Sequence, residues 1–466
     1  MLFTKIFNTS LHHKIIFNTR FYSNKWNPFK RTWNLISNEL KFTNKSSIFY
    51  PEHADVVIIG GGFIGTSVGY WLKTKAGAGL SVVILEKDLT YSGIQTNFSL
   101  GSLTQHFSLA ENIYLSQYSV DFFRNIKANL NEDVDIKFFP NGYLVLASDK
   151  YADQLEQNVA LQKEHGVKNE LLTSADIKKK YPWINTTDIK LGCIGTESEG
   201  LFNPWALLKG LLFKCHELGT TIVKAEVIGF EMEHQRDVLM EGVAPGSFRR
   251  INKVVYKTDD NEEHSIKFAA CVLAAGDNSG EIAKLAQIGV EDGLLKVPLP
   301  VERREFNIYS IDDENIKANI NTPSIMDTSG LWLRRNGLEN SFLCGHTPLV
   351  NNGVKELLTD EYYTNIIQPS LLNRYNFSKE NQVKRLHTEA YDCNIYDDTG
   401  ILGSHPYHSN LIIAAGFGKL GCHHAPGIGR GVAELIIDGR YCSIDLTRFG
   451  FDRLLVNEPL VEFNMY

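Results

Sequence analysis

The sequence predicts an α/β fold in which a nucleotide-binding domain is assembled from separate stretches of the chain, together with a second, α+β domain. Apolar, strand-like runs alternate with helical stretches near both ends, at residues 55–86 and 411–438. Between them the pattern is more antiparallel, and an Asn-Gly turn at residues 336–337 separates two strand-like runs. Strands with helical crossovers on either side of an antiparallel middle indicate that the second domain is inserted into the first.

The first element is a Rossmann-like motif. Residues 56–86 run through an apolar strand, a glycine turn, a helix and a second strand that ends in an acid. The turn has G-x-G-x-x-G spacing, with Gly60, Gly62 and Gly65. Gly62 would let the backbone approach a pyrophosphate at the positive end of the helix, and Glu86 would accept hydrogen bonds from ribose hydroxyls. An ordinary glycine turn would not explain the acid, so the motif predicts a dinucleotide site.

The remaining elements follow in order along the chain. Helices are expected at residues 111–130, 151–166, 174–181, 205–218, 360–375 and 428–438. Strands are expected at residues 138–148, 221–230, 269–276, 298–310, 331–335, 341–345 and 411–415. We therefore assign residues 51–130, 190–295 and 397–450 to the nucleotide-binding domain. Residues 131–189 and 296–396 form the second domain, with a mixed or antiparallel sheet, and residues 451–466 form a C-terminal tail.

The composition limits the function classes. With 466 residues, 43% hydrophobic and 22% charged, the chain suits two or three globular domains. A net charge of −7 gives no reason to expect nucleic-acid binding. No apolar run approaches the roughly 20 residues that a spanning helix needs, so we expect a soluble or peripheral protein without a transmembrane segment. The seven cysteines include no C-x-x-C pair, which argues against a disulfide framework, and no metal site is predicted.

The first fifty residues differ from the rest of the chain. Their only acid is Glu39, whereas basic residues recur among Ser, Thr, Asn and scattered apolar side chains. This composition is typical of a mitochondrial transit peptide, and the alternative is a disordered basic arm. We expect the folded part to begin near Pro51.

Several segments carry a family resemblance. They are GGGFIG with Glu86, the VIGFE strand, AAGDNSG, and the late run GFGKLGCHHAPGIG. With these segments the chain resembles the D-amino acid oxidase and sarcosine oxidase group of flavoproteins. The stretches FSLAENIYLS, LPVERREFNIY, DTSGLWLRRNGL and YDDTGILGSHP make it most similar to a mitochondrial branch of that group, linked to assembly of respiratory complex I.

The resemblance implies an FAD site. The FAD-contacting residues that it implies are Gly60, Gly62, Phe63, Ile64, Gly65, Glu86, Lys87, Val227, Ala275, Gly276, Gly416, Phe417, Gly418 and Gly421. Among them the backbone of Val227 would meet the adenine, and the last four would lie beside the flavin ring. The cysteine that attaches FAD in some relatives aligns with Ala390, not with Cys393. The resemblance therefore implies that FAD is bound non-covalently.

The chain also departs from the family pattern. A basic residue that helps to hold the substrate carboxylate is replaced by Thr104, and the usual glycine loop contains Lys419 and Leu420 where a histidine is expected. The lysine that often follows that loop is His423 here. A carboxylate clamp made of those residues is therefore absent or rebuilt.

Two functions follow. One is oxidation of the C–H bond beside the nitrogen of a small amine or amino acid, for which the candidate substrate-side residues are His106, Arg334, His387, His405 and His423. No single residue is assigned as the catalyst. The other function, which the departures favour, is an FAD-containing support for assembly of complex I. Its partners would be complex I subunits or assembly intermediates, and its location the mitochondrial matrix, possibly peripheral on the inner membrane. An open, polar cavity over the flavin would favour the enzyme, and a plugged cavity would favour the support.

Overall fold

The computed structural model describes residues 50–91, 101–195, 197–239, 243–291, 293, 295–314, 316, 318–337, 340–347, 358–378 and 383–463. The chain divides into two units, Met1–Ile48 and Phe49–Tyr466, and every described residue belongs to the second unit. The expected leader lies outside the described residues, as do residues 92–100.

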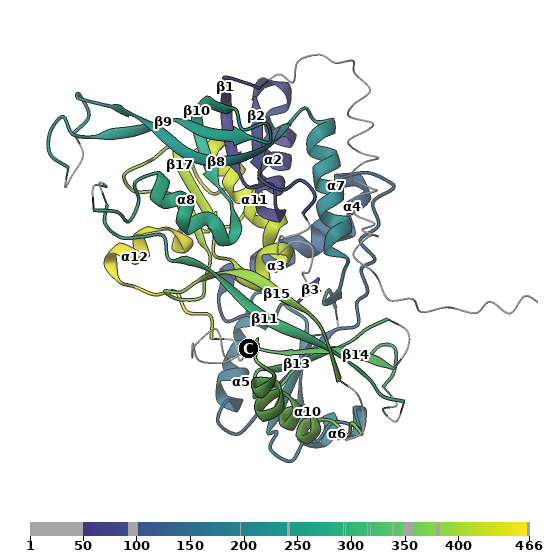
Figure 1. Cartoon of the computed structure of the whole chain (residues 1–466). Coiled ribbons are helices and arrows are strands. Elements are labelled where there is room, and N and C mark those ends of the chain that lie inside the picture. Colours follow the sequence, from purple (N-terminus) through teal and green to yellow (C-terminus); the bar gives the residue numbers. More distant parts are fainter. Residues whose placement is uncertain are drawn as a thin grey trace, which may run out of the picture. The chain divides into compact units, whose positions relative to one another are not determined.

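A seven-stranded sheet forms one half of the second unit (Figure 1). Its strands, in spatial order, are β1 (His53–Ile59), β2 (Val82–Glu86), β8 (Thr221–His234), β9 (Arg249–Thr258), β10 (Glu263–Leu273), β17 (Leu411–Ala415) and β16 (Ile401–Ser404). β1 pairs in parallel with both β2 and β10, and β10 pairs in parallel with β17. The predicted first strand, β1, thus lies beside β10 from the middle of the chain. β17, from near the end of the chain, is the next strand after β10.

Alternating side chains of these strands supply two cores. Val56 and Ile58 pack in the core that contains α2 (Phe63–Ala76), α3 (Ala110–Arg124), α7 (Pro204–Glu217) and α11 (Gly421–Asp438). Val57 and Ile59 belong to the opposite core, with α8 (Ser279–Leu285) and α12 (Asp452–Val456). A strand buried on both faces reads as a continuous apolar run, which is what the sequence shows here.

An eight-stranded sheet forms the other half. Its order is β15 (Val383–Asn394), β11 (Val301–Asp312), β14 (Ser341–His346), β13 (Leu331–Arg335), β12 (Ser324–Met326), β4 (Tyr143–Ala147), β6 (Leu191–Gly195) and β5 (Asn169–Thr173). All neighbours are antiparallel except β12 and β4. One face packs on α6 (Ser174–Lys180) and α10 (Gln368–Arg374), and α5 (Ala152–Glu164) contributes to the core on the other face.

The predicted α/β fold is confirmed, and several elements differ in their bounds. The hairpin across residues 336–337 forms as predicted, from β13 and β14. The expected helix 111–130 divides into α3 and α4 (Ile126–Asn129), and the expected helix 360–375 consists of α9 (Asp360–Tyr362), a π-helical turn (Tyr363–Ile367) and α10. β6 lies in the eight-stranded sheet, although the predicted boundary at residue 190 assigned it to the nucleotide-binding domain.

The last long helix begins at Gly421, seven residues before the predicted start at residue 428. The glycines and Pro426 in this stretch resemble a loop, but they serve close helix packing. A Cβ on Gly427 would lie 2.6 Å from Leu115 Cδ2, and one on Gly429 would lie 2.3 Å from Ser67 Oγ. Only glycine lets α11 approach α3 and α2 this closely, and the predicted start of the helix at residue 428 was wrong.

The end of the described chain packs on the loop that precedes α3. The carboxylate of Glu462 accepts hydrogen bonds from Ser108 and from Asn112 Nδ2, the latter at 2.7 Å. A carboxylate at a helix N-terminus is favourable because the first backbone N–H groups carry positive partial charge. Part of the predicted C-terminal tail is therefore packed against the N-terminal end of α3.

The glycine turn after β1 generates the first prediction. A Cβ on Gly65 would lie 1.9 Å from the carbonyl oxygen of Gly60, a distance that no side chain tolerates without movement of the backbone. We expect Gly65→Ala to destabilise the protein by roughly 1–3 kcal/mol in urea denaturation. The control is Gly79→Ala, because a Cβ there meets nothing within 4 Å. Equal stability of the two variants would contradict this packing.

Candidate functional site

A cavity of about 800 Å³ lies where strands of the nucleotide sheet end and reaches one face of the eight-stranded sheet. Its nucleotide-sheet wall contains Ile59 and Glu86, the last residues of β1 and β2, together with Val227 of β8 and Ala275 just after β10. In open α/β sheets, ligands bind outside the carboxyl ends of the strands, so this wall is suited to a dinucleotide.

The glycine turn after β1 forms part of this wall of the cavity. Gly60 has φ +100°, and a Cβ there would lie 2.2 Å from the carbonyl oxygen of Ala274, so the turn sits directly against the end of β10. Gly62 is the N-cap of α2, and Phe63 and Ile64 in its first turn also line the cavity. The unpaired N–H groups and the dipole of a 14-residue helix therefore meet the cavity, where they favour an anion such as a pyrophosphate.

Glu86 lies beside the same turn with 6% of its surface exposed. Its Oε2 accepts the Gly61 N–H at 2.7 Å, and its Oε1 accepts the Asp88 N–H at 2.8 Å. Burial raises the pKa of this carboxyl group. Each oxygen keeps a second lone pair, and the side chain lines the cavity, so it can also accept hydrogen bonds from ribose hydroxyls. Next to it, Lys87 forms an exposed ion pair with Glu226 at 2.6 Å.

A second helix N-terminus meets the far end of the cavity. Gly418, at φ +59°, opens a short 3-10 turn, and Gly421 begins the 18-residue helix α11. The backbone just before this turn is fixed by a hydrogen bond, in which Asp392 accepts the Gly416 N–H at 2.6 Å. Burial raises the pKa of Asp392 to about 7. The first turn of α11 brings His423 to the cavity wall, where burial lowers its pKa to about 3 and keeps the ring neutral.

The opposite wall is one face of the eight-stranded sheet. Its residues share that face because of the strand register, in which Phe306 pairs with Glu389 and Trp332 with Met326. Side chains from five strands line the cavity here: Tyr143, Ser324, Met326, Trp332, Arg334, Phe306, Glu389 and Tyr391. This wall combines aromatic rings with charged groups, as a small-molecule site does.

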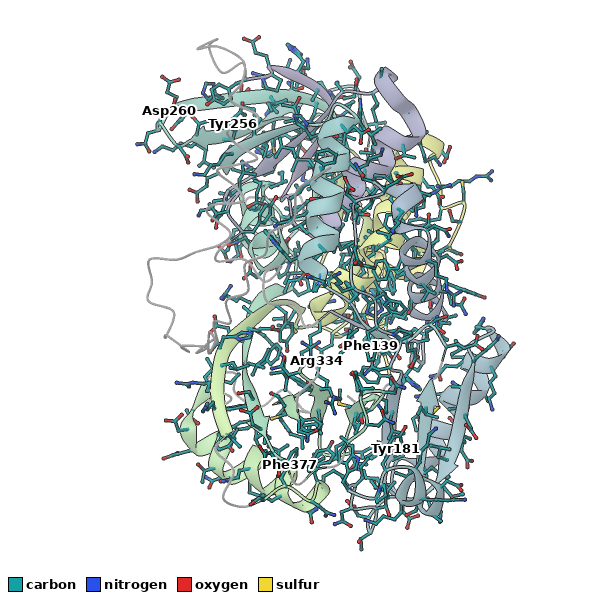
Figure 2. All side chains as sticks on the ribbon, turned by 90° about the vertical axis from the view of Figure 1, so that its right-hand side faces the viewer. Phe139, Tyr181, Tyr256, Asp260, Arg334 and Phe377 are labelled. Carbon is teal, nitrogen blue, oxygen red and sulfur yellow. The ribbon has the colours of Figure 1, made fainter. Side chains whose placement is uncertain are left out.

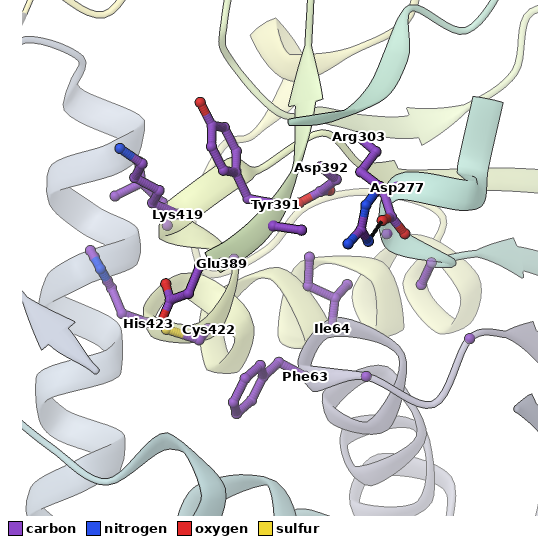
Figure 3. Close-up of a pocket in the computed structure, with 18 of the residues that line it drawn as sticks. Phe63, Ile64, Asp277, Arg303, Glu389, Tyr391, Asp392, Lys419, Cys422 and His423 are labelled. Atoms are coloured by element: carbon purple, nitrogen blue, oxygen red, sulfur yellow. Dashed lines mark hydrogen bonds and ion pairs between the residues drawn. The ribbon is translucent and has the colours of Figure 1, made fainter. Parts of the chain in front are cut away.

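Three charged groups meet on this side of the cavity. Arg334 lies in the interior of the molecule (Figure 2), where burial lowers its pKa to about 10 and Glu389 opposes that shift. Lys419 presents its surface to the cavity, enclosed by protein, and the loss of bulk water lowers its pKa to about 8. Burial raises the pKa of Glu389, and neighbouring cations oppose the rise. Figure 3 shows Lys419 and Glu389 on one side of the cavity and the ion pair of Arg303 and Asp277 on the other.

The Lys419 ammonium is held by an aromatic pair. Its Nζ lies 4.6 Å from the centre of the Phe306 ring and 5.3 Å from that of Tyr391, and it donates a hydrogen bond to Thr347 Oγ1. These contacts fix a positive charge at the end of the cavity where α11 begins.

The structure places the predicted cofactor residues in two groups. Lining the cavity are Gly60, Gly62, Phe63, Ile64, Glu86, Lys87, Val227, Ala275, Gly276, Gly418 and Gly421. Gly65, Gly416 and Phe417 are not among the lining residues and shape the turns behind them.

The five substrate-side candidates are not gathered in one place. Arg334 and His423 line the cavity, and His387 lies beside Glu389 with 34% of its side chain exposed. His106 is buried next to Glu199, with Nε2 and Oε2 3.3 Å apart. Burial, the largest single effect, disfavours its charge, but Glu199 and Cys193 together outweigh burial and raise the pKa of His106 well above its usual value. His405 stacks on His408 and packs on Phe451, away from the cavity lining.

Sequence reasoning missed the wall residues Tyr143, Trp332, Glu389 and Tyr391. The only signal was the alternation of β15, which puts His387, Glu389 and Tyr391 on one face. Nothing local shows that this face borders a cavity.

The fold and the cavity define a class of proteins that bind a dinucleotide at a glycine turn, between a nucleotide-binding sheet and a second, mixed sheet. A model of the FAD dependent oxidoreductase family matches residues 55–435, and the chain belongs to this family. FAD is accordingly its cofactor, and the glycine turn, the two helix N-termini and the Glu86 carboxylate fit it.

The relatives cover most of the chain. It is 40% identical over 423 residues to the FAD-dependent oxidoreductase domain-containing protein 1 homolog of Drosophila melanogaster, covering 89% of this chain and 81% of the relative. It is 36% identical to FAD-dependent oxidoreductase domain-containing protein 1 of Xenopus laevis, covering 95% and 88%.

Solved structures share the fold at low sequence identity. L-proline dehydrogenase from P. horikoshii has a TM-score of 0.66 at 22% identity, covering 88% of this chain and 100% of that one. Iminodiacetate oxidase from Chelativorans sp. BNC1 has a TM-score of 0.61 at 18% identity, covering 85% and 98%. Among the described residues, no helix combines the length and apolarity needed to cross a bilayer.

Proposed function

We propose that this oxidoreductase oxidises the C–H bond beside the nitrogen of a small amine that also carries an acidic group. The observation that carries the proposal is the meeting of Arg334 and Glu389, on the eight-stranded sheet, with Lys419 of the turn before α11. Two cations suit the acid of such a substrate, and one carboxylate suits its ammonium. Thr104 lines the cavity without a charge, and in this proposal the carboxylate clamp is rebuilt from Arg334 of β13 and Lys419 of the turn before α11.

The cofactor assignments are part of this proposal. Gly62 and the first turn of α2 would hold the pyrophosphate, Glu86 the ribose, and Val227 the adenine. The flavin would then lie between Gly418, Gly421 and the eight-stranded sheet. Bound there, FAD supplies the acceptor for a hydride, and the protein contributes orientation, exclusion of water and charge.

The proposal is tested by anaerobic flavin reduction with N-methylglycine, L-proline, iminodiacetate and 4-methylaminobutanoate. At least one of these amines should bleach the flavin. Lys419→Met should raise the amine concentration needed for half-maximal rate about 10- to 100-fold, because a charge-assisted hydrogen bond of about 1.5–3 kcal/mol is lost. The matched control is Lys127→Met, an exposed lysine of α4. A flavin that no amine reduces would refute the proposal.

We propose non-covalent binding of the FAD. Ala390 lines the cavity at the position that the resemblance gives to an attaching cysteine, and it has no nucleophile. Cys393 instead donates to Asp398 Oδ1 at 3.0 Å and is not among the lining residues. Acid precipitation should release the yellow colour into the supernatant. Flavin that stays in the pellet, and is lost in Cys393→Ser, would contradict this.

We propose that the activity serves assembly of respiratory complex I in the mitochondrial matrix, with complex I subunits or assembly intermediates as partners. The support is the resemblance of FSLAENIYLS, LPVERREFNIY and DTSGLWLRRNGL to the assembly-linked branch, and the basic composition of the first fifty residues. The cavity has a volume of about 800 Å³, and its mainly apolar lining includes the charged groups of Arg334, Lys419 and Glu389, which favours a role for the chemistry over a purely structural support.

Cells that lack the protein would test this role. Wild-type protein should restore complex I. Gly62→Val, which crowds the pyrophosphate position, should lose FAD and fail. Lys419→Met should keep FAD and restore complex I poorly. If Lys419→Met retains FAD and fully restores complex I, the protein acts as a structural support and not through its chemistry. If flavin-free Gly62→Val fully restores complex I, FAD is not needed for the role. Deletion of residues 1–50 should leave the protein in the cytosol.

A further inference from the structure

Glu389 and His387 form a path between the cavity and solvent. They are two residues apart on β15, so their side chains share one face of the strand, opposite Phe306 and Ile308 of β11. Glu389 lines the cavity with 6% of its surface exposed, and its Oε1 lies 3.4 Å from His387 Nε2. The His387 side chain is 34% exposed. A buried carboxylate in the cavity is thus linked by one hydrogen bond to an imidazole at the surface.

An amine substrate makes such a path necessary. Small aliphatic amines are ammonium ions near neutral pH, and an ammonium nitrogen has no lone pair to form a C=N bond. The nitrogen must lose a proton before the neighbouring C–H bond can be broken as hydride. Cationic Arg334 and Lys419 cannot take that proton, and buried His423 is a weak base with a pKa of about 3. Glu389 is the cavity carboxylate whose charge interacts with both Arg334 and Lys419.

We infer that Glu389 accepts the ammonium proton of the substrate and that His387 passes it to solvent; the inference rests on the proposed amine oxidation. One N–H proton goes to a Glu389 oxygen, which leaves a lone pair on nitrogen. That pair forms the C=N bond as the C–H hydrogen leaves with both its electrons, for which FAD is the oxidant. The proton then moves to His387 Nε2, and the other ring nitrogen releases one to water.

The surroundings suit Glu389 to this work. Burial raises its pKa, which makes the carboxylate a stronger base, while Arg334, Lys419 and a protonated His387 favour the ionised form. The His387 ring has two nitrogens, so one can accept a proton while the other gives one up, and the residue relays without being consumed.

The first test uses binding alone. The probes are 2-aminoisobutyrate, which has no C–H beside its nitrogen, and isobutyrate, which has the same acid and no amine. Binding is followed by the change in flavin absorbance of the holoprotein. Glu389→Gln should weaken the binding of 2-aminoisobutyrate about 10- to 100-fold, and it should leave the binding of isobutyrate unchanged or make it tighter. The control is Glu302→Gln, an exposed carboxylate on neighbouring β11. Equal weakening of both probes, or of neither, would overturn the inference.

The second test uses the rate of anaerobic flavin reduction at saturating amine. In the wild type this rate should fall as pH falls and Glu389 is protonated. Glu389→Gln should be about 10²–10⁴-fold slower near pH 7 and recover at alkaline pH, where the amine arrives already neutral. Saturation removes the effect of Lys419, which loses its charge above a pKa of about 8 and so weakens binding. A purely structural role for Glu389 would give no alkaline recovery.

The third test concerns His387. His387→Gln should bind both probes normally and reduce its flavin more slowly, and added imidazole should restore the rate at this partly exposed position. Absence of imidazole rescue would remove His387 from the path. If no amine reduces the wild-type flavin, the proposed oxidation fails with the relay, whereas normal reduction in Glu389→Gln overturns only the inference.

Discussion

The close approach of backbone segments around Gly60 is the constraint on which the rest of the molecule depends. The Ala274 carbonyl occupies the space of its missing Cβ, and the Gly60 carbonyl in turn occupies that of Gly65. β1, α2 and β10 therefore meet without side chains between them. This contact forms the floor of the cavity and leaves the first turn of α2 facing it. It also places the Gly61 N–H where it donates to the Glu86 carboxylate. A larger residue at either glycine would separate the elements that bind the cofactor.

The second half of the molecule supplies chemistry to this frame. Its sheet places alternate residues of five strands at the cavity, so a few positions on different strands can change the charge of the cavity wall without altering the fold. In this chain the positive charge comes from β13 and from the turn before α11, and the negative charge from β15. Folds of this kind accept many substrates because the cofactor frame and the charged wall vary separately. The low sequence identity to structures with the same architecture fits that independence.

Local signals gave the parts of the structure that could be foreseen. The glycine turn, the acid after β2 and the Asn336-Gly337 hairpin each depend on a few adjacent residues. Glu389 could not be foreseen, because its place over the cavity follows from pairing with a strand more than 80 residues away. The start of α11 was missed for a related reason, since Gly427 looks like a loop residue until its contact with α3 is known. The position of β6 in the second sheet likewise depends on pairing with β4 and β5.

The nucleotide sheet is assembled from residues near 53 and residues near 415, and this has a consequence for synthesis. A chain that emerges from the ribosome makes β1, α2 and β2 first, but α11, which covers the cavity end of that sheet, emerges only after residue 420. The apolar faces of the early strands then remain without their final partner for most of translation. Cofactor capture becomes a late step, and an incomplete chain has no smaller folded unit in which to hold FAD. Until those partners emerge, the exposed strands and helix faces are prone to aggregate.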